Sequence, residues 1–69
     1  MQGRYEITMW KLGEDNTCES SFACRCDTEW ELIELFDCLT RGIRGHYKAW
    51  AIDIKDGRTI RESEVSYSR

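Results

Sequence analysis

Four cysteines and one histidine are the side chains of this sequence with the greatest potential for metal binding or nucleophilic chemistry. Cys18, Cys24, Cys26 and Cys38 follow the spacing C-x5-C-x-C-x11-C, and His46 lies further along, so the ligands would suffice for a tetrahedral zinc ion. Structural zinc sites usually take their ligands from C-x2-4-C pairs, whereas the two positions of a C-x-C pair on a strand are about 6–7 Å apart. We therefore expect no metal and no other cofactor.

The thiols also lack the sequence context of a redox or nucleophilic centre. A reactive cysteine needs a neighbouring base or a helix N-terminus to lower its pKa, and the sequence has no C-x-x-C motif and no recognisable cysteine–histidine arrangement. The first residues, MQGRYEITMW, have neither the basic nor the apolar segment of an export signal. We accordingly expect a cytoplasmic protein with reduced cysteines.

The remaining polar residues do not form a recognisable active site either. Glu29 and Glu31 are two positions apart, so on a helix they point to different sides, and Glu62 and Glu64 on an exposed strand are typical of solvated charge. His46 is more typical of a strand end than of a general base. Because there is also no phosphate-binding loop and no serine nucleophile motif, we expect that the protein is not an enzyme.

Length and composition indicate one small folded domain over residues 1–69. Hydrophobic residues make up 41% and charged residues 33% of the chain, there is no proline, and no apolar run is long enough to span a bilayer. A core of this size is only marginally stable without a staple, a metal or a partner subunit. Homodimerisation is therefore one possibility.

The central segment, residues 27–43, has the periodicity of an amphipathic helix. Its apolar residues recur at i, i+4, i+7 and i+11 and should face a core: Leu32, Phe36, Leu39 and Ile43. Thr28 and Glu31 have the spacing of a capping box, with Asp27 as an alternative cap, and Gly42 or Gly45 could end the helix.

Four segments around this helix have the alternation of strands: residues 4–12, 18–26, 46–55 and 58–65. The predicted core faces are Tyr5, Ile7 and Met9 in the first segment and Trp50, Ile52 and Ile54 in the third. In the second segment, Phe22, Cys24 and Cys26 share one side. Between the last two strands, a turn with Gly57 in a left-handed bulge would place Ile52 opposite Ile60. We prefer it to a two-residue loop that pairs Lys55 with Arg58.

These elements predict an α+β fold in the order β-β-α-β-β, with a small, largely antiparallel sheet and one helix packed on one face. The other face of the sheet would then be open. With the core faces assigned above, this open face would carry a flat group of aromatic and small residues: Trp10, Tyr47, Ala49, Ala51 and Tyr67. Such a patch is either functional or an ordinary set of exposed apolar residues.

Charge is distributed unevenly along the chain. Residues 1–40 carry nine acidic and three basic residues, whereas residues 41–69 carry seven basic and four acidic ones. On the predicted helix, Trp30 falls on the outer side among acidic residues. Its ring either lies against the helix start or a neighbouring loop, or it serves as an aromatic anchor for a partner. The outer acidic residues, Asp27, Glu31, Glu34 and Asp37, are either a solvated face or a surface that competes for an arginine- and lysine-lined groove.

The interpretation we prefer is a small, non-catalytic protein-binding module that contacts a larger protein with a basic surface. The expected contact residues are Trp30, Glu31, Glu34 and Asp37 on the helix and Trp10 and Tyr47 on the open sheet face. The most specific form of this hypothesis is an inhibitor of phage or mobile-element origin, of the anti-CRISPR kind, which covers a nucleic-acid-binding surface. The alternatives are a nucleic-acid-binding protein that uses the basic second half, and a structural homodimer.

Overall fold

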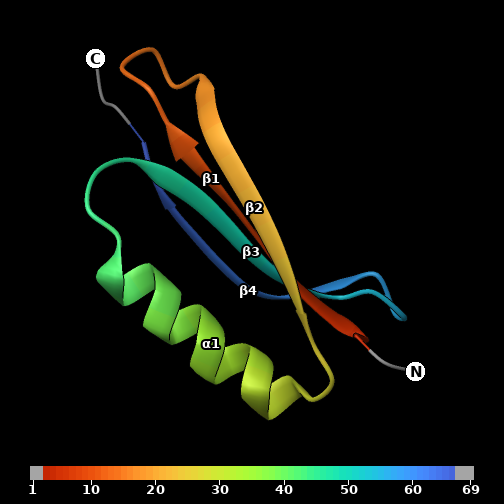
Figure 1. Ribbon diagram of the computed structural model, residues 1–69. Coiled ribbons are helices and arrows are strands. Elements are labelled where there is room, and N and C mark those ends of the chain that lie inside the picture. The colour runs from red at the N-terminus through yellow and green to blue at the C-terminus, as the bar shows by residue number, and fades with distance from the viewer. Residues whose placement is uncertain (1–2, 67–69) are drawn as a thin grey trace.

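A computed structural model describes residues 3–66, which form one four-stranded antiparallel sheet with a helix on one face (Figure 1). The elements along the chain are β1 (Tyr5–Leu12), β2 (Cys18–Cys26), α1 (Glu29–Gly42), β3 (Tyr47–Asp53) and β4 (Arg58–Val65). In space the strands lie in the order β2-β1-β3-β4. The predicted α+β fold, with the order β-β-α-β-β, is confirmed.

Helix α1 begins with the hydroxyl half of the predicted capping box. Thr28 is the N-cap residue, and its hydroxyl accepts a hydrogen bond from the backbone N–H of Glu31 at 3.2 Å and lies 3.1 Å from the Glu31 carboxylate. The helix ends at Gly42, one of the two predicted stops. Within the described part of the chain, no helix combines the length and apolar character needed to cross a membrane.

The inner stripe of α1 packs on the sheet as predicted. Leu32 and Phe36 are buried, and Leu39 and Ile43 pack against the same core at its margin. From the sheet, the predicted face of β1 joins them through Tyr5, Ile7 and Met9. On β2, register places Phe22, Cys24 and Cys26 opposite these three residues and thus on the same face.

The orientation of β3 differs from the prediction. Ile7 is opposite Ala51 and Met9 is opposite Ala49, so the alanines of β3 face the helix, together with Tyr47 and Asp53. Trp50 and Ile52 lie half-buried on the open face. Both faces of β3 carry apolar side chains, so alternation alone does not identify the inner one. The small side chains are inside because α1 packs directly above them.

The turn between β3 and β4 also differs in register. Gly57 has the expected positive φ of 66°, but Ile52 is opposite Thr59 rather than Ile60, and Asp53 is opposite Arg58. The irregularity lies within the strands, between Ala51 and Ile52, and leaves Ile60 as an extra residue on β4. The Asp53 side chain accepts backbone hydrogen bonds from Lys55 and Asp56 inside the turn, which stabilise this longer loop.

Candidate partner-binding surfaces

The outer face of α1 carries the most exposed large apolar side chain among residues 3–66. Trp30 is 68% exposed, because the inner stripe of the helix fixes its ring on the side away from the sheet. Glu31, Glu34 and Asp37 are exposed on the same helix. The four residues predicted here are therefore brought together on one accessible element, which we call the outer helix face.

The charge of the outer helix face remains acidic after its ion pairs are counted. Asp37 pairs with Arg41 at 2.9 Å, with both side chains largely exposed, and Glu29 lies 3.5 Å from Arg58 on β4. Exposed pairs of this kind contribute little stability and are easily exchanged for other partners. Glu34 forms no ion pair with any residue in the range 3–66. A cationic partner could thus reach carboxylates that the fold does not require.

On the open face of the sheet, two tryptophans form a pair. The rings of Trp10 and Trp50 meet edge to face, with centroids 5.0 Å apart and an interplanar angle of 79°. This pairing follows from register, since Trp10 is opposite Lys48 and Thr8 is opposite Trp50, which makes the two tryptophans diagonal neighbours. Trp10 remains 39% exposed.

Most charged side chains of the open face are paired with one another. Arg25 lies 3.2 Å from Glu6, and Lys48 lies 3.9 Å from Glu64. The predicted contribution of Tyr47, Ala49 and Ala51 to this face is wrong, because all three are buried under α1. Tyr67 lies outside the described residues. The open face therefore carries the tryptophan pair and Ile52 among mostly paired charges, and is not a flat aromatic patch.

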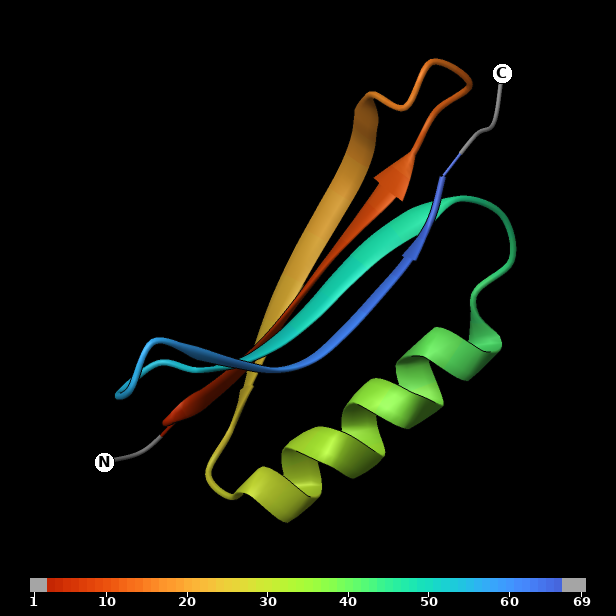
Figure 2. The same cartoon turned by 180° about the vertical axis from the view of Figure 1, so that it is seen from behind.

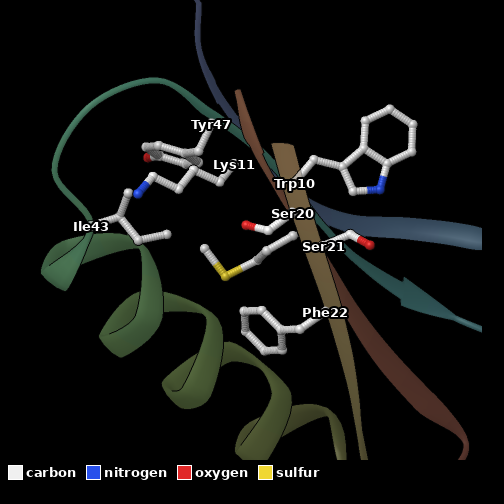
Figure 3. Close-up of a pocket in the computed structure, with 8 residues that line it drawn as sticks. Trp10, Lys11, Ser20, Ser21, Phe22, Ile43 and Tyr47 are labelled. Carbon is white, nitrogen blue, oxygen red and sulfur yellow. The ribbon is translucent and has the colours of Figure 1, made fainter. Parts of the chain in front are cut away.

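Tyr47 lines a third surface that the sequence did not reveal. An apolar groove of about 280 Å³ lies between the end of the sheet and the C-terminal end of α1, lined by residues that include Phe22, Ile43 and Tyr47 (Figure 3). The Tyr47 hydroxyl is 2.8 Å from the Ser63 hydroxyl. Figure 3 also shows the indole of Trp10 pointing away from these side chains. The groove was missed because the inner face of β3 was assigned incorrectly.

An ion pair with a buried carboxylate is the other feature that the sequence did not indicate. Asp53 is fully buried and receives two hydrogen bonds from Arg4, Nε to Oδ1 at 3.1 Å and a terminal nitrogen to Oδ2 at 2.8 Å. The backbone N–H of Lys55 donates to the same carboxylate at 3.1 Å. The Arg4 hydrogen bonds are the main reason why the pKa of Asp53 is lowered to about 2. With every oxygen engaged, this carboxylate holds the turn and is not available as a general base.

The cysteines are free thiols and do not converge. Cys18 and Cys38 are exposed, whereas Cys24 is half-buried and Cys26 is buried. Burial raises the pKa of both Cys24 and Cys26, which disfavours the reactive thiolate. Among residues 3–66, no group of three histidine, cysteine or acidic side chains is placed to hold a metal ion.

The six predicted contact residues thus lie on three separate surfaces. The outer helix face carries four of them: Trp30, Glu31, Glu34 and Asp37. Trp10 is on the open sheet face, and Tyr47 is in the groove. Only the outer helix face combines a largely exposed aromatic ring with unbalanced charge. No protein-family model, curated protein or solved structure matches this chain.

Proposed function

We propose that this chain is a small, non-catalytic protein-binding module that docks its outer helix face on a basic surface of a larger protein. The observation that carries the proposal is the 68% exposure of Trp30 next to acidic residues. A tryptophan left in water contributes little to the stability of its own fold, yet buried at an interface it is among the side chains that contribute most to affinity.

The acidic residues add orientation and speed to this contact. Glu31, Glu34 and Asp37 follow one another at three-residue steps, which spaces them about 4.5 Å apart along the helix axis. A row of carboxylates attracts a basic groove and accelerates association at low salt. Where that groove normally binds nucleic-acid phosphates, occupation by this helix would inhibit binding, as in an inhibitor of phage or mobile-element origin of the anti-CRISPR kind.

The test compares four variants as bait in capture from a host lysate, followed by affinity measurement with the captured protein. Trp30→Ala and Glu34→Lys change the outer helix face. Their matched controls, Trp10→Ala and Glu62→Lys, change exposed residues of the sheet in the same way. We expect Trp30→Ala to weaken binding of the captured protein by ten-fold or more. Glu34→Lys should also weaken binding and should reduce the salt dependence of the association rate. The two control variants should bind like the wild type.

Two results would contradict this proposal. Loss of binding with Trp10→Ala but not with Trp30→Ala would move the contact to the open sheet face. Salt-dependent binding of short oligonucleotides by the purified chain would favour the nucleic-acid alternative. The net charge of −3 at pH 7 disfavours this alternative, because nucleic-acid-binding domains are usually basic.

A further inference from the structure

The apolar groove at the end of α1 exists because the hairpin of β1 and β2 is longer than the helix that covers it. Helix α1 ends at Gly42, and Figure 2 shows the upper part of β1 and β2 extending past this end. Met9 is buried there, whereas Phe22, its partner on β2, is 45% exposed. The groove, of about 280 Å³, thus keeps part of an apolar wall in contact with water.

One end of this groove is polar. Lys11 is directly opposite Ser20, which lies two positions from Phe22 toward the hairpin turn. The two residues are therefore on the same face as Phe22, about 7 Å from it along the strands. Figure 3 shows the Lys11 side chain extending across the groove toward Ile43, and the Ser20 hydroxyl turned to the same side. Polar and apolar groups are thus separated along the groove, with the polar ones nearer the hairpin turn.

The groove is positively charged in a chain that is acidic overall. The net charge of the chain is −3, yet no acidic residue of the described part lines the groove, and Lys11 is its cation. Within residues 3–66, the Lys11 ammonium forms no ion pair and the Ser20 hydroxyl forms no hydrogen bond. Glu19, the neighbour of Ser20, has its carboxylate over Gly13 in the hairpin turn. Two hydrogen-bond donors are therefore left for an anionic group that the described chain does not supply.

We propose that this groove binds a small amphipathic carboxylate, with its apolar part against Phe22 and Ile43 and its carboxylate at Lys11 and Ser20. A carboxylate has one negative charge and two acceptor oxygens, which one ammonium and one hydroxyl can match. A phosphate monoester has a charge of about −1.5 to −2 and three acceptor oxygens, more than these two donors can satisfy.

The size of the groove limits the ligand. Its volume of about 280 Å³ is just below the range of roughly 300–1,000 Å³ of pockets that hold drug-sized molecules. The apolar part of the ligand is therefore a short alkyl chain or a single ring, which covers the exposed ring of Phe22. The groove shares no residue with the outer helix face, so this proposal does not depend on the proposed function.

Three probes with the same eight-carbon chain test the role of the carboxylate: octanoate, octan-1-ol and octylammonium. Two-dimensional NMR titrations of the full chain at pH 7 measure the dissociation constant of each. We expect a value between about 0.1 and 1 mM for octanoate, roughly five-fold weaker binding of octan-1-ol, and no saturable binding of octylammonium. The amide signals that octanoate shifts should belong to β1 and β2 around Lys11 and Phe22.

Two variants test the two ends of the groove separately. Lys11→Met removes the ammonium and keeps an apolar stem, so octanoate should bind roughly five-fold more weakly while octan-1-ol is unaffected. Lys55→Met is the matched control, because Lys55 is an exposed lysine in the β3–β4 turn at the other end of the sheet, and it should retain the preference for octanoate. Phe22→Ala should weaken octanoate and octan-1-ol by a similar factor, and circular dichroism checks its folding.

Several results would overturn the proposal. Octanoate that does not saturate, or that binds the wild type no more tightly than octan-1-ol does, would show that the groove has no carboxylate site. Shifts confined to the amides around Trp10 and Trp50 would place the ligand on the open face instead. An equal loss of octanoate affinity in Lys55→Met and Lys11→Met would show an effect of net charge rather than of the groove.

Discussion

The two faces of the sheet use large and small side chains in opposite ways. Under α1, β3 contributes Ala49 and Ala51, both fully buried, and the bulk of the core comes from the helix and β1. On the open face, β3 contributes Trp50 and Ile52, which remain half-buried. On a strand with apolar residues on both faces, the smaller set can mark the buried face, because a packed helix leaves little room there.

The faces also differ in their ion pairs. On the helix side, Asp53 is buried and bonded to both Arg4 and the backbone of the turn. On the open side, the pair of Arg25 with Glu6 joins side chains that are partly exposed. Removing Asp53 takes a buried acceptor away from both Arg4 and the N–H groups of the turn, whereas the exposed partners of the second pair are rehydrated. Stability should therefore depend strongly on the first pair and weakly on the second.

The largest expected effect comes from Asp53→Asn. The variant removes the buried charge that accepts from Arg4 and from the turn, while Arg4 keeps its contact with Asp56 at 3.4 Å, and we expect the Tm at pH 7 to fall by roughly 15 °C. Thermal unfolding followed by circular dichroism measures this, with Glu6→Gln, which alters the exposed pair, as the matched control. A similar small change for both variants would show that the two faces do not differ in this respect.

Acid provides a second measurement on the same residue. The pKa of Asp53 is about 2 in the folded chain, below its ordinary value of 3.8, so its contribution is complete above about pH 5 and is lost as the pH falls toward 2. The difference in Tm between the wild type and Asp53→Asn should therefore narrow between pH 5 and pH 2. A constant difference across this range would contradict the assignment of the effect to the Asp53 charge.

A smaller effect is expected from filling the space under the helix. Ala51→Leu adds three carbons at a fully buried position and should destabilise the fold by about 2 kcal/mol, close to 10 °C in Tm. Ala23→Leu makes the same change at an exposed position of the open face, where we expect less than about 0.5 kcal/mol. Chemical denaturation of both variants measures the difference. Equal tolerance would mean that α1 packs loosely on β3.

The sequence predicted the features that depend on local spacing. The inner stripe of α1 follows from helical periodicity, and the position of Trp30 on the outer helix face follows from the same periodicity. The inner face of β3 depends instead on its pairing with β1. The paired residues Ile7 and Ala51, for example, are 44 positions apart in the chain. The bond between Arg4 and Asp53 spans 49 residues and has no local signature. The groove was missed for the same reason, because Tyr47 was placed on the wrong face.

The smallest effect concerns the tryptophan pair of the open face. Trp10→Ala removes the edge-to-face contact with Trp50, and because Trp10 is already 39% exposed we expect a loss of about 1 kcal/mol, less than for Ala51→Leu. The Trp30 ring is still more exposed and has no such contact with another aromatic ring in residues 3–66. Trp30→Ala should therefore change the free energy of unfolding by less than about 0.5 kcal/mol. Urea denaturation compares the two. A loss with Trp10→Ala larger than that with Ala51→Leu would indicate a second core on the open face.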